Sequence, residues 1–187
     1  MKTTASTLKI LVVLTGLLVL AACNPIEKTS KSDSMLIVES ITGTNAAGTT
    51  TNYLESNVSA TTADTATATL QAALLEPDAT SSSQYNSITV TGYQITYTLP
   101  DGTGQAGVTV PAPIEGTCSS LLITIGNTVS LDFIAVTSAA KLVAPLSALA
   151  GTANQLQVVA HIIFTGHDGT NHPVQATGQL AILFDSH

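Results

Sequence analysis

The chain of 187 residues carries five basic residues, all of them lysine, against twelve acidic residues, so its formal net charge is −7. Nucleic-acid binding depends on neutralising phosphates with Lys and Arg, so this balance excludes a nucleic-acid partner, and the lack of arginine argues against recognition of acidic substrates. Only 9% of the residues are charged and 44% are hydrophobic, which is unlike a disordered acidic tail and typical of a folded domain.

The N-terminus has the pattern of a secretory signal peptide. Lys2 and Lys9 precede an apolar run over residues 10–22, and this run is too short to span a membrane as a helix. It ends in Leu20-Ala21-Ala22-Cys23, which resembles the lipobox of bacterial lipoproteins. The resemblance implies that a peptidase cuts before Cys23 and that Cys23 carries the lipid, so Cys23 is the expected lipidation site. The alternative is an ordinary signal peptide that ends near a cysteine by chance.

The same resemblance implies a location. Asn24, rather than Asp, follows the cysteine, which in one sorting rule of bacterial lipoproteins points to the outer membrane. Several acyl chains on Cys23 would anchor the protein stably, because a single chain binds a membrane only marginally. Removal of residues 1–22 takes two lysines and no acidic residue, so the net charge becomes 3 − 12 = −9. Residues 23–34 are polar and lack periodicity, which predicts a flexible tether before a domain over 35–187.

The first half of the expected domain contains three predicted strands. Residues 36–41 form a β-branched run, and residues 65–75 alternate at period two, which favours a strand over a helix. Between them, residues 42–64 are rich in Thr, Ser, Asn and Gly and predict mostly loop. Residues 87–99 give the clearest strand, in which the face carrying Tyr93, Ile95 and Tyr97 is the expected core face toward the end of the strand.

The second half contains four more predicted strands, over residues 120–125, 128–137, 154–165 and 173–184. Gly126-Asn127 predicts a two-residue hairpin between the first pair. The polar residues 166–172 predict a hairpin loop between the last pair, whose apolar positions alternate most regularly. A short edge segment is expected at 108–110, and a helical turn after Pro145.

About seven or eight short strands separated by turn residues predict an all-β fold, an antiparallel two-sheet sandwich. The arrangement resembles immunoglobulin-like and fibronectin type III-like domains of bacterial surface proteins over residues 35–184. The Cys–Trp–Cys pattern of true immunoglobulin domains is absent, because the chain has no Trp and only Cys118 besides Cys23. The resemblance implies a fold and no activity.

Cys118 is the single thiol that remains once Cys23 carries lipid, so no intrachain disulfide is expected. A buried small apolar side chain on a strand is the favoured role. The alternative is a thiol that pairs between chains or stays reactive.

The best candidate for metal chemistry is the 166–172 loop. His167 and His172 flank it, and they could share a metal with Asp168 as an oxygen ligand. His161 is expected to lie about 20 Å from His167 on an extended strand, at about 3.3 Å per residue, and does not join them. Two histidines and one carboxylate are weak candidates for a metal site, so polar residues in a tight turn are the favoured interpretation and no metal is expected.

No motif indicates catalysis: the chain has no Gly-x-Ser-x-Gly elbow, no His-Glu-x-x-His and no phosphate-binding glycine loop. For carbohydrate recognition, Tyr53 and Tyr85 are the best aromatic candidates. We therefore expect no enzyme and no cofactor, but a lipid-anchored interaction or assembly module of the cell envelope whose partners are the membrane and an envelope protein. The alternative is a small-ligand or metal-binding lipoprotein that uses the 166–172 loop.

Overall fold

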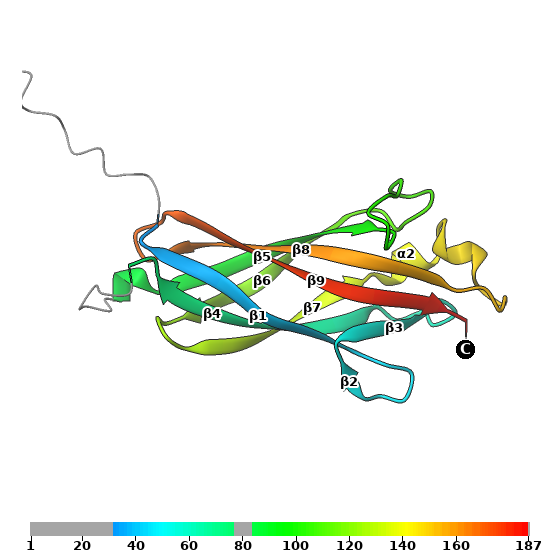
Figure 1. The fold of residues 1–187 in the computed structure, drawn as a ribbon, viewed down its shortest axis with the longest axis horizontal. Helices are drawn as coiled ribbons and strands as arrows, with labels where there is room; N and C mark the ends of the chain where they lie inside the picture. The colour runs from blue at the N-terminus through cyan, green and yellow to red at the C-terminus, as the bar shows by residue number, and fades with distance from the viewer. Residues whose placement is uncertain (1–31, 77–83, 187) are drawn as a thin grey trace, which may run out of the picture. The chain divides into compact units, whose positions relative to one another are not determined.

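The computed structural model describes residues 32–76 and 84–186. They form two β-sheets packed face to face, with little helix (Figure 1). The four-stranded sheet has the order β2-β1-β4-β7, and the five-stranded sheet has the order β3-β9-β8-β5-β6. The strand pairs are antiparallel except for β3 and β9, which run parallel. The predicted all-β, two-sheet architecture is confirmed.

The four-stranded sheet consists of β1 (Ser34–Thr44), β2 (Thr50–Thr51), β4 (Asp64–Leu74) and β7 (Thr128–Val136). The five-stranded sheet consists of β3 (Tyr53–Asn57), β5 (Ile88–Thr98), β6 (Ile114–Ile123), β8 (Leu156–Asp168) and β9 (Pro173–Asp185). Three short helices lie in the connections: η1 (Gln84–Asn86), α2 (Ser138–Lys141) and η2 (Leu146–Ala148), the last of which is the turn expected after Pro145. Among the described residues, no helix has the length and apolar character needed to cross a membrane.

A β-bulge in β5 divides this strand into two halves with opposite alternation. The side chains that face the core are Ile88 and Val90 before the bulge, and Tyr93, Ile95 and Tyr97 after it. The pairing of β5 with both of its neighbours skips Thr91, and one extra residue moves the following side chains to the other face. The core face predicted toward the end of the strand, with Tyr93, Ile95 and Tyr97, is therefore confirmed, and in the first half of the strand the bulge turns the other face to the core.

The prediction that residues 42–64 are mostly loop was wrong in part, because β2 and β3 lie within them. In β3 the inward positions are Leu54, which is 2% exposed, and Ser56, which is completely buried. The Ser56 hydroxyl donates a hydrogen bond to Asp64 Oδ2 at 2.5 Å, so a polar side chain occupies an inward position. Because Ser56 is polar, β3 lacks the alternation of apolar and polar residues by which strands are identified in a sequence.

The predicted hairpin at Gly126-Asn127 was also wrong. These residues do form a turn, since Gly126 has φ +80° and its N–H donates to the carbonyl of Ala72 at 2.8 Å. The flanking strands, however, belong to different sheets, so the chain crosses from one layer to the other here. The predicted edge segment at 108–110 is not a strand either, and its last residue, Val110, is only 1% exposed.

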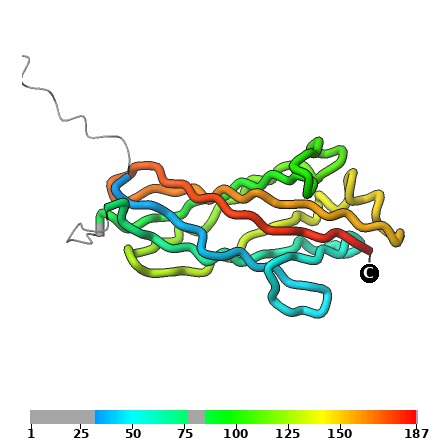
Figure 2. The backbone as a smooth tube through the Cα atoms, viewed as in Figure 1, coloured from blue at the N-terminus to red at the C-terminus, as the bar shows by residue number. Residues whose placement is uncertain are grey.

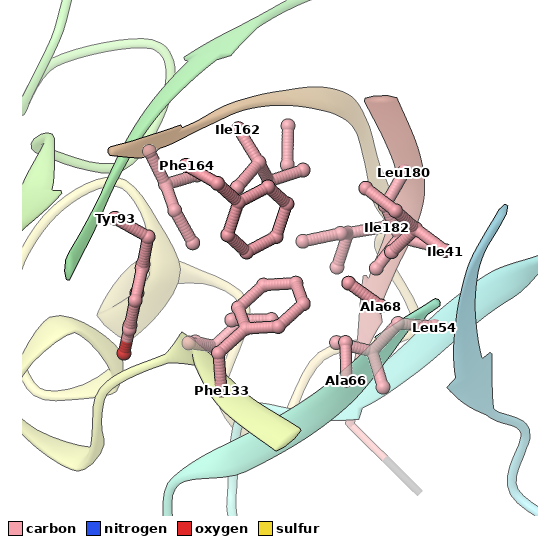
Figure 3. Packing of buried hydrophobic residues seen from close by; sticks show 14 of the residues in the cluster. Ile41, Leu54, Ala66, Ala68, Tyr93, Phe133, Ile162, Phe164, Leu180 and Ile182 are labelled. Atoms are coloured by element: carbon pink, nitrogen blue, oxygen red, sulfur yellow. The ribbon is translucent and has the colours of Figure 1, made fainter. Parts of the chain in front are cut away.

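The core between the sheets contains three aromatic rings in mutual contact. Phe133 of β7 and Phe164 of β8 meet edge to face, with ring centroids 5.5 Å apart (Figure 3). The ring of Tyr93 lies 5.3 Å from that of Phe133. Because Phe133 and Phe164 belong to opposite sheets, this cluster fixes the two layers against each other.

The two long sides of the sandwich are closed in different ways. On one side, β1 packs against β9 and β3. On the other side lie the edge strands β6 and β7, and two tyrosines reach from β5 to the backbone of β7. The hydroxyl of Tyr97 donates to the Ala135 carbonyl at 2.8 Å, and that of Tyr93 accepts from the Ile134 N–H at 3.1 Å. Both bonds satisfy polar backbone groups of an edge strand.

The two ends of the sandwich also differ (Figure 2). We call one the Ser32 end: it holds residues 32–33, η1, the β8–β9 turn and the crossover at 124–127. The first strand begins at Ser34, so the fold includes the last residues of the predicted tether. We call the other the loop end: it holds the connections 58–63, 99–113 and 137–155 and the end of β9 (Figure 1).

Candidate functional site

The β8–β9 turn is organised by the carboxylate of Asp168. This residue is the last of β8 and is only 3% exposed. Its Oδ1 accepts hydrogen bonds from the Thr170 amide at 2.8 Å, the Thr170 hydroxyl at 2.7 Å and the His172 amide at 2.9 Å. Burial alone would raise the pKa of Asp168, but these bonds, together with one from the Ser32 hydroxyl, lower it to about 2. Asp168 therefore stays ionised at neutral pH and holds the turn closed.

The bond from Ser32 ties the first described residue of the chain to this turn. Ser32 is 7% exposed, and its hydroxyl oxygen also accepts the amide of Ser34 at 3.0 Å. The hydroxyl of Ser34 donates to the Asn86 carbonyl in η1 at 2.8 Å. The Asp33 carbonyl accepts the Leu75 amide at 2.9 Å. The beginning of the domain is thus fixed to three separate connections at the Ser32 end.

The three weak metal candidates lie together, but each makes contacts within the turn. His172 Nδ1 is 2.8 Å from the Thr170 hydroxyl and 3.5 Å from Asp168 Oδ2. His167 Nδ1 is 2.9 Å from the Asp168 carbonyl, and since a carbonyl only accepts, this nitrogen carries the proton. A metal here would have to displace hydrogen bonds that close the turn. Over residues 32–76 and 84–186, no three His, Cys, Asp or Glu side chains are grouped as a metal site.

His161 and Tyr53 lie on the outer face of the five-stranded sheet, toward the loop end. His161 Nε2 is 2.9 Å from the Thr98 hydroxyl, and both side chains line a shallow hollow of about 400 Å³. Tyr53 lines a second hollow of about 310 Å³ with Gln157 and Ala181. The other tyrosine singled out in the sequence, Tyr85, is 61% exposed at the Ser32 end. Tyr53 pairs with Ala181 in β9, away from the Ser32 end, so the two tyrosines do not form a joint platform for a sugar.

Cys118 lies on β6 beside a cleft of about 450 Å³ between the two edge strands. The cleft is also lined by Tyr93, Leu121 and Phe133. Cys118 is partly buried and packs against the core, and burial raises the pKa of its thiol above the ordinary value. These surroundings support the favoured role, a small apolar side chain on a strand.

The loop end exposes apolar side chains that the sequence analysis did not identify. Leu142 is 75% exposed, while Val143 and Val108 are each 55% exposed. Leu142 and Val143 protrude because their neighbours in the chain, Lys141 and Leu146, are buried at 2% and 0% exposure. An apolar pair just before Pro145 was the available sequence signal, but a helical segment explains such a pair equally well.

The loop end also contains a buried lysine, Lys141. Lys141 is the only basic Lys or Arg residue from residue 32 onward. Its ammonium group lies 2.9 Å from Asp64 Oδ2 and 3.0 Å from Oδ1, with 1% of the side chain exposed. The described surface therefore displays no lysine or arginine charge, while eleven acidic residues lie from residue 32 onward.

No protein-family model, curated protein or solved structure matches the chain.

Proposed function

We propose that the chain is a lipid-anchored, non-catalytic β-sandwich of the bacterial outer membrane, attached through Cys23, that presents its loop end to an envelope protein. The lipobox and the following Asn24 support the anchor and its location. The observation that supports the recognition role is the difference between the two ends of the sandwich. The described chain begins at one end, with Ser32, and the long connections lie at the other (Figure 1). A chain held by its N-terminus directs those connections away from its anchor.

The strand order supports an immunoglobulin-like relationship. If β1, β4 and β7 are named A, B and E, and β5, β6, β8 and β9 are named C, C′, F and G, the sheets have the orders β2-A-B-E and β3-G-F-C-C′. Immunoglobulin-type sandwiches place these strands in the same two sheets. In variable-type domains of this class the B–C and F–G loops carry recognition. With these strand names those loops lie at the Ser32 end, so the proposed recognition at the loop end is supported by its own residues and not by this likeness.

The loop end has the chemistry of a protein-binding surface. Leu142, Val143 and Val108 offer apolar contact area, and protein interfaces typically have an apolar centre surrounded by a polar, solvated rim. The absence of exposed Lys and Arg from the described surface favours a partner with neutral or basic groups.

Two experiments test this proposal. For the anchor, the Cys23→Ser variant should lose its acyl chains, detected by mass spectrometry, and should leave the membrane fraction. For the recognition end, a photo-cross-linking amino acid at Val143 should capture a stoichiometric envelope protein in living cells, whereas the same amino acid at Thr177, exposed on β9, should not. Membrane attachment that survives Cys23→Ser, or equal capture from both positions, would contradict the proposal.

The alternative, a metal- or ligand-binding lipoprotein using residues 166–172, has less support because Asp168 already accepts the donors of its own turn. It predicts that Zn²⁺ or Ni²⁺ raises the melting temperature of the wild-type chain and not of a His167→Ala, His172→Ala double variant. The proposal made above predicts no metal-dependent shift in either protein.

A further inference from the structure

We infer that the Ser32 end of the sandwich rests on the lipid headgroup layer, with Met35, Leu75, Tyr85 and Leu122 in contact with the bilayer. This inference rests on the proposed lipid anchor at Cys23. It adds a second, non-covalent contact with the membrane and gives the domain a defined orientation.

The first observation is the distribution of exposed apolar side chains. Of the eight large hydrophobic residues that are well exposed in the described chain, four lie at the Ser32 end: Met35 at 40%, Leu75 at 54%, Tyr85 at 61% and Leu122 at 59%. They come from both layers, since Met35 and Leu75 extend from β1 and β4, and Leu122 lies on β6 opposite Thr89 of β5. They therefore surround the end of the sandwich rather than forming a patch on one face.

The second observation is the length of chain between this end and the lipid. Nine peptide links separate Cys23 from Ser32, and a fully extended chain of that length spans about 30 Å. Residues 32 and 33 do not add to the length of this connection, because they are held in the fold. Ser32 is hydrogen-bonded to Asp168, and the Asp33 carbonyl accepts the Leu75 amide. The apolar side chains at the Ser32 end are thus always within a short distance of the membrane, at a high effective concentration.

The third observation concerns charge at the same end. Asp33 and Glu76 are exposed beside the apolar side chains, and carboxylates do not enter the hydrocarbon region. Contact is therefore limited to the headgroup layer, where the ammonium groups of zwitterionic lipids can pair with Asp33 and Glu76. Tyr85 suits this depth, because tyrosine combines an apolar ring with a polar hydroxyl.

The experiment uses the absence of tryptophan from the chain. A Tyr85→Trp variant of the lipidated full-length protein is reconstituted in phosphatidylcholine vesicles that contain a lipid with a nitroxide quencher on its headgroup. We expect the tryptophan emission in these vesicles to be at least twofold lower than in vesicles without the quencher. The matched control, Val143→Trp at the loop end, should keep its emission. A Leu75→Trp variant serves as a second reporter if Tyr85→Trp lowers the stability of the fold.

Adding Met35→Ser, Leu75→Ser and Leu122→Ser to the Tyr85→Trp variant should abolish the quenching while the protein still floats with the vesicles. Flotation without quenching of either reporter at the Ser32 end would overturn this inference and leave the lipid anchor intact. Equal quenching of the Val143→Trp control would also overturn it, because the domain would then have no preferred orientation. Absence of acylation at Cys23, or failure to float, would instead refute the proposed function.

Discussion

The ammonium group of Lys141 lies 2.9 Å from the carboxylate of Asp64, in an ion pair that joins the helix after β7 to the first residue of β4. The lysine side chain is 1% exposed and the aspartate side chain 19% exposed. Asp64 also accepts the hydroxyl of Ser56. This ion pair fixes the base of the protruding Leu142–Val143 segment. Its two members, Lys141 and Asp64, differ in their exposure to water.

That asymmetry predicts unequal effects of removing each partner. Asp64→Ala leaves a charged lysine buried without a partner and should lower the free energy of unfolding by about 3–5 kcal/mol. Lys141→Met leaves only the partly exposed Asp64 and should cost less. The double variant should recover most of the loss, because no buried charge remains. Urea unfolding of the three variants measures these differences, with Glu76→Gln as an exposed control. Equal losses in the two single variants would contradict the prediction.

The contact between Tyr93 and Gly116 predicts a steric effect at the edge of the five-stranded sheet. A Cβ added to Gly116 would lie 2.2 Å from Cζ of Tyr93, so Gly116→Ala must displace the ring and should cost about 1–3 kcal/mol. Thr117→Ala, at the exposed neighbouring position, should be nearly neutral. In the Tyr93→Leu background, Gly116→Ala should cost much less than alone, and thermal or urea unfolding would show this non-additivity.

The Tyr93 hydroxyl also protects a backbone amide of the edge strand β7. In Tyr93→Phe, the Ile134 N–H loses its acceptor at 3.1 Å, so its hydrogen exchange should become faster while stability falls by about 0.5–1.5 kcal/mol. Tyr97→Phe removes the donor to the Ala135 carbonyl instead and should leave the exchange of Ile134 unchanged. Hydrogen-exchange NMR distinguishes the two variants.

The lowered pKa of Asp168 predicts a specific dependence of stability on pH. The pKa falls from 3.8 in the unfolded chain to about 2 in the fold, so ionised Asp168 contributes about 2 kcal/mol of stability above pH 4–5. This contribution is lost as the pH falls toward 2. The stability difference between the wild-type chain and Asp168→Asn should therefore shrink between pH 6 and pH 2. A difference that stays constant over this range would show that ionisation of Asp168 does not stabilise the fold.

The thiol of Cys118 should react slowly, because burial raises its pKa above 9.0 and the thiolate is the reactive form. The pH at which alkylation reaches half its maximal rate should lie above that value. A Cys118→Ser, Ser119→Cys variant moves the thiol to the exposed neighbouring position and should restore an ordinary titration. Faster reaction at Cys118 than at position 119 would contradict the burial argument.

The strands differ, for physical reasons, in how clearly the sequence reveals them. The strands β8 and β9 were predicted because their alternation has no interruption over their paired length. In β5, the extra residue Thr91 reversed the alternation within one strand, and only the pairing reveals it. At Gly126-Asn127 the residues specify a turn, but the choice between a hairpin and a crossover depends on which sheet each flanking strand joins.

The candidate site could be predicted from the sequence only in part, because several of its contacts join residues that are far apart in the chain. That Asp168 lies in a polar turn could be inferred from its neighbours Gly169 and Thr170. Its burial under Ser32, and the pairing of Lys141 with Asp64, which are 77 residues apart, have no local signal. The exposure of Leu142 and Val143 depends on the burial of Lys141 and was hidden for the same reason.

The position of Lys141 also determines how the protein responds to proteases that cut after basic residues. It is the only Lys or Arg from residue 32 onward, and it is 2% exposed. The other two lysines of the proposed mature chain, Lys28 and Lys31, precede the described fold in the sequence. The described residues therefore offer such a protease no exposed cleavage point. With the proposed anchor at Cys23, cleavage after Lys28 or Lys31 would release the domain whole from the membrane instead of degrading it in place.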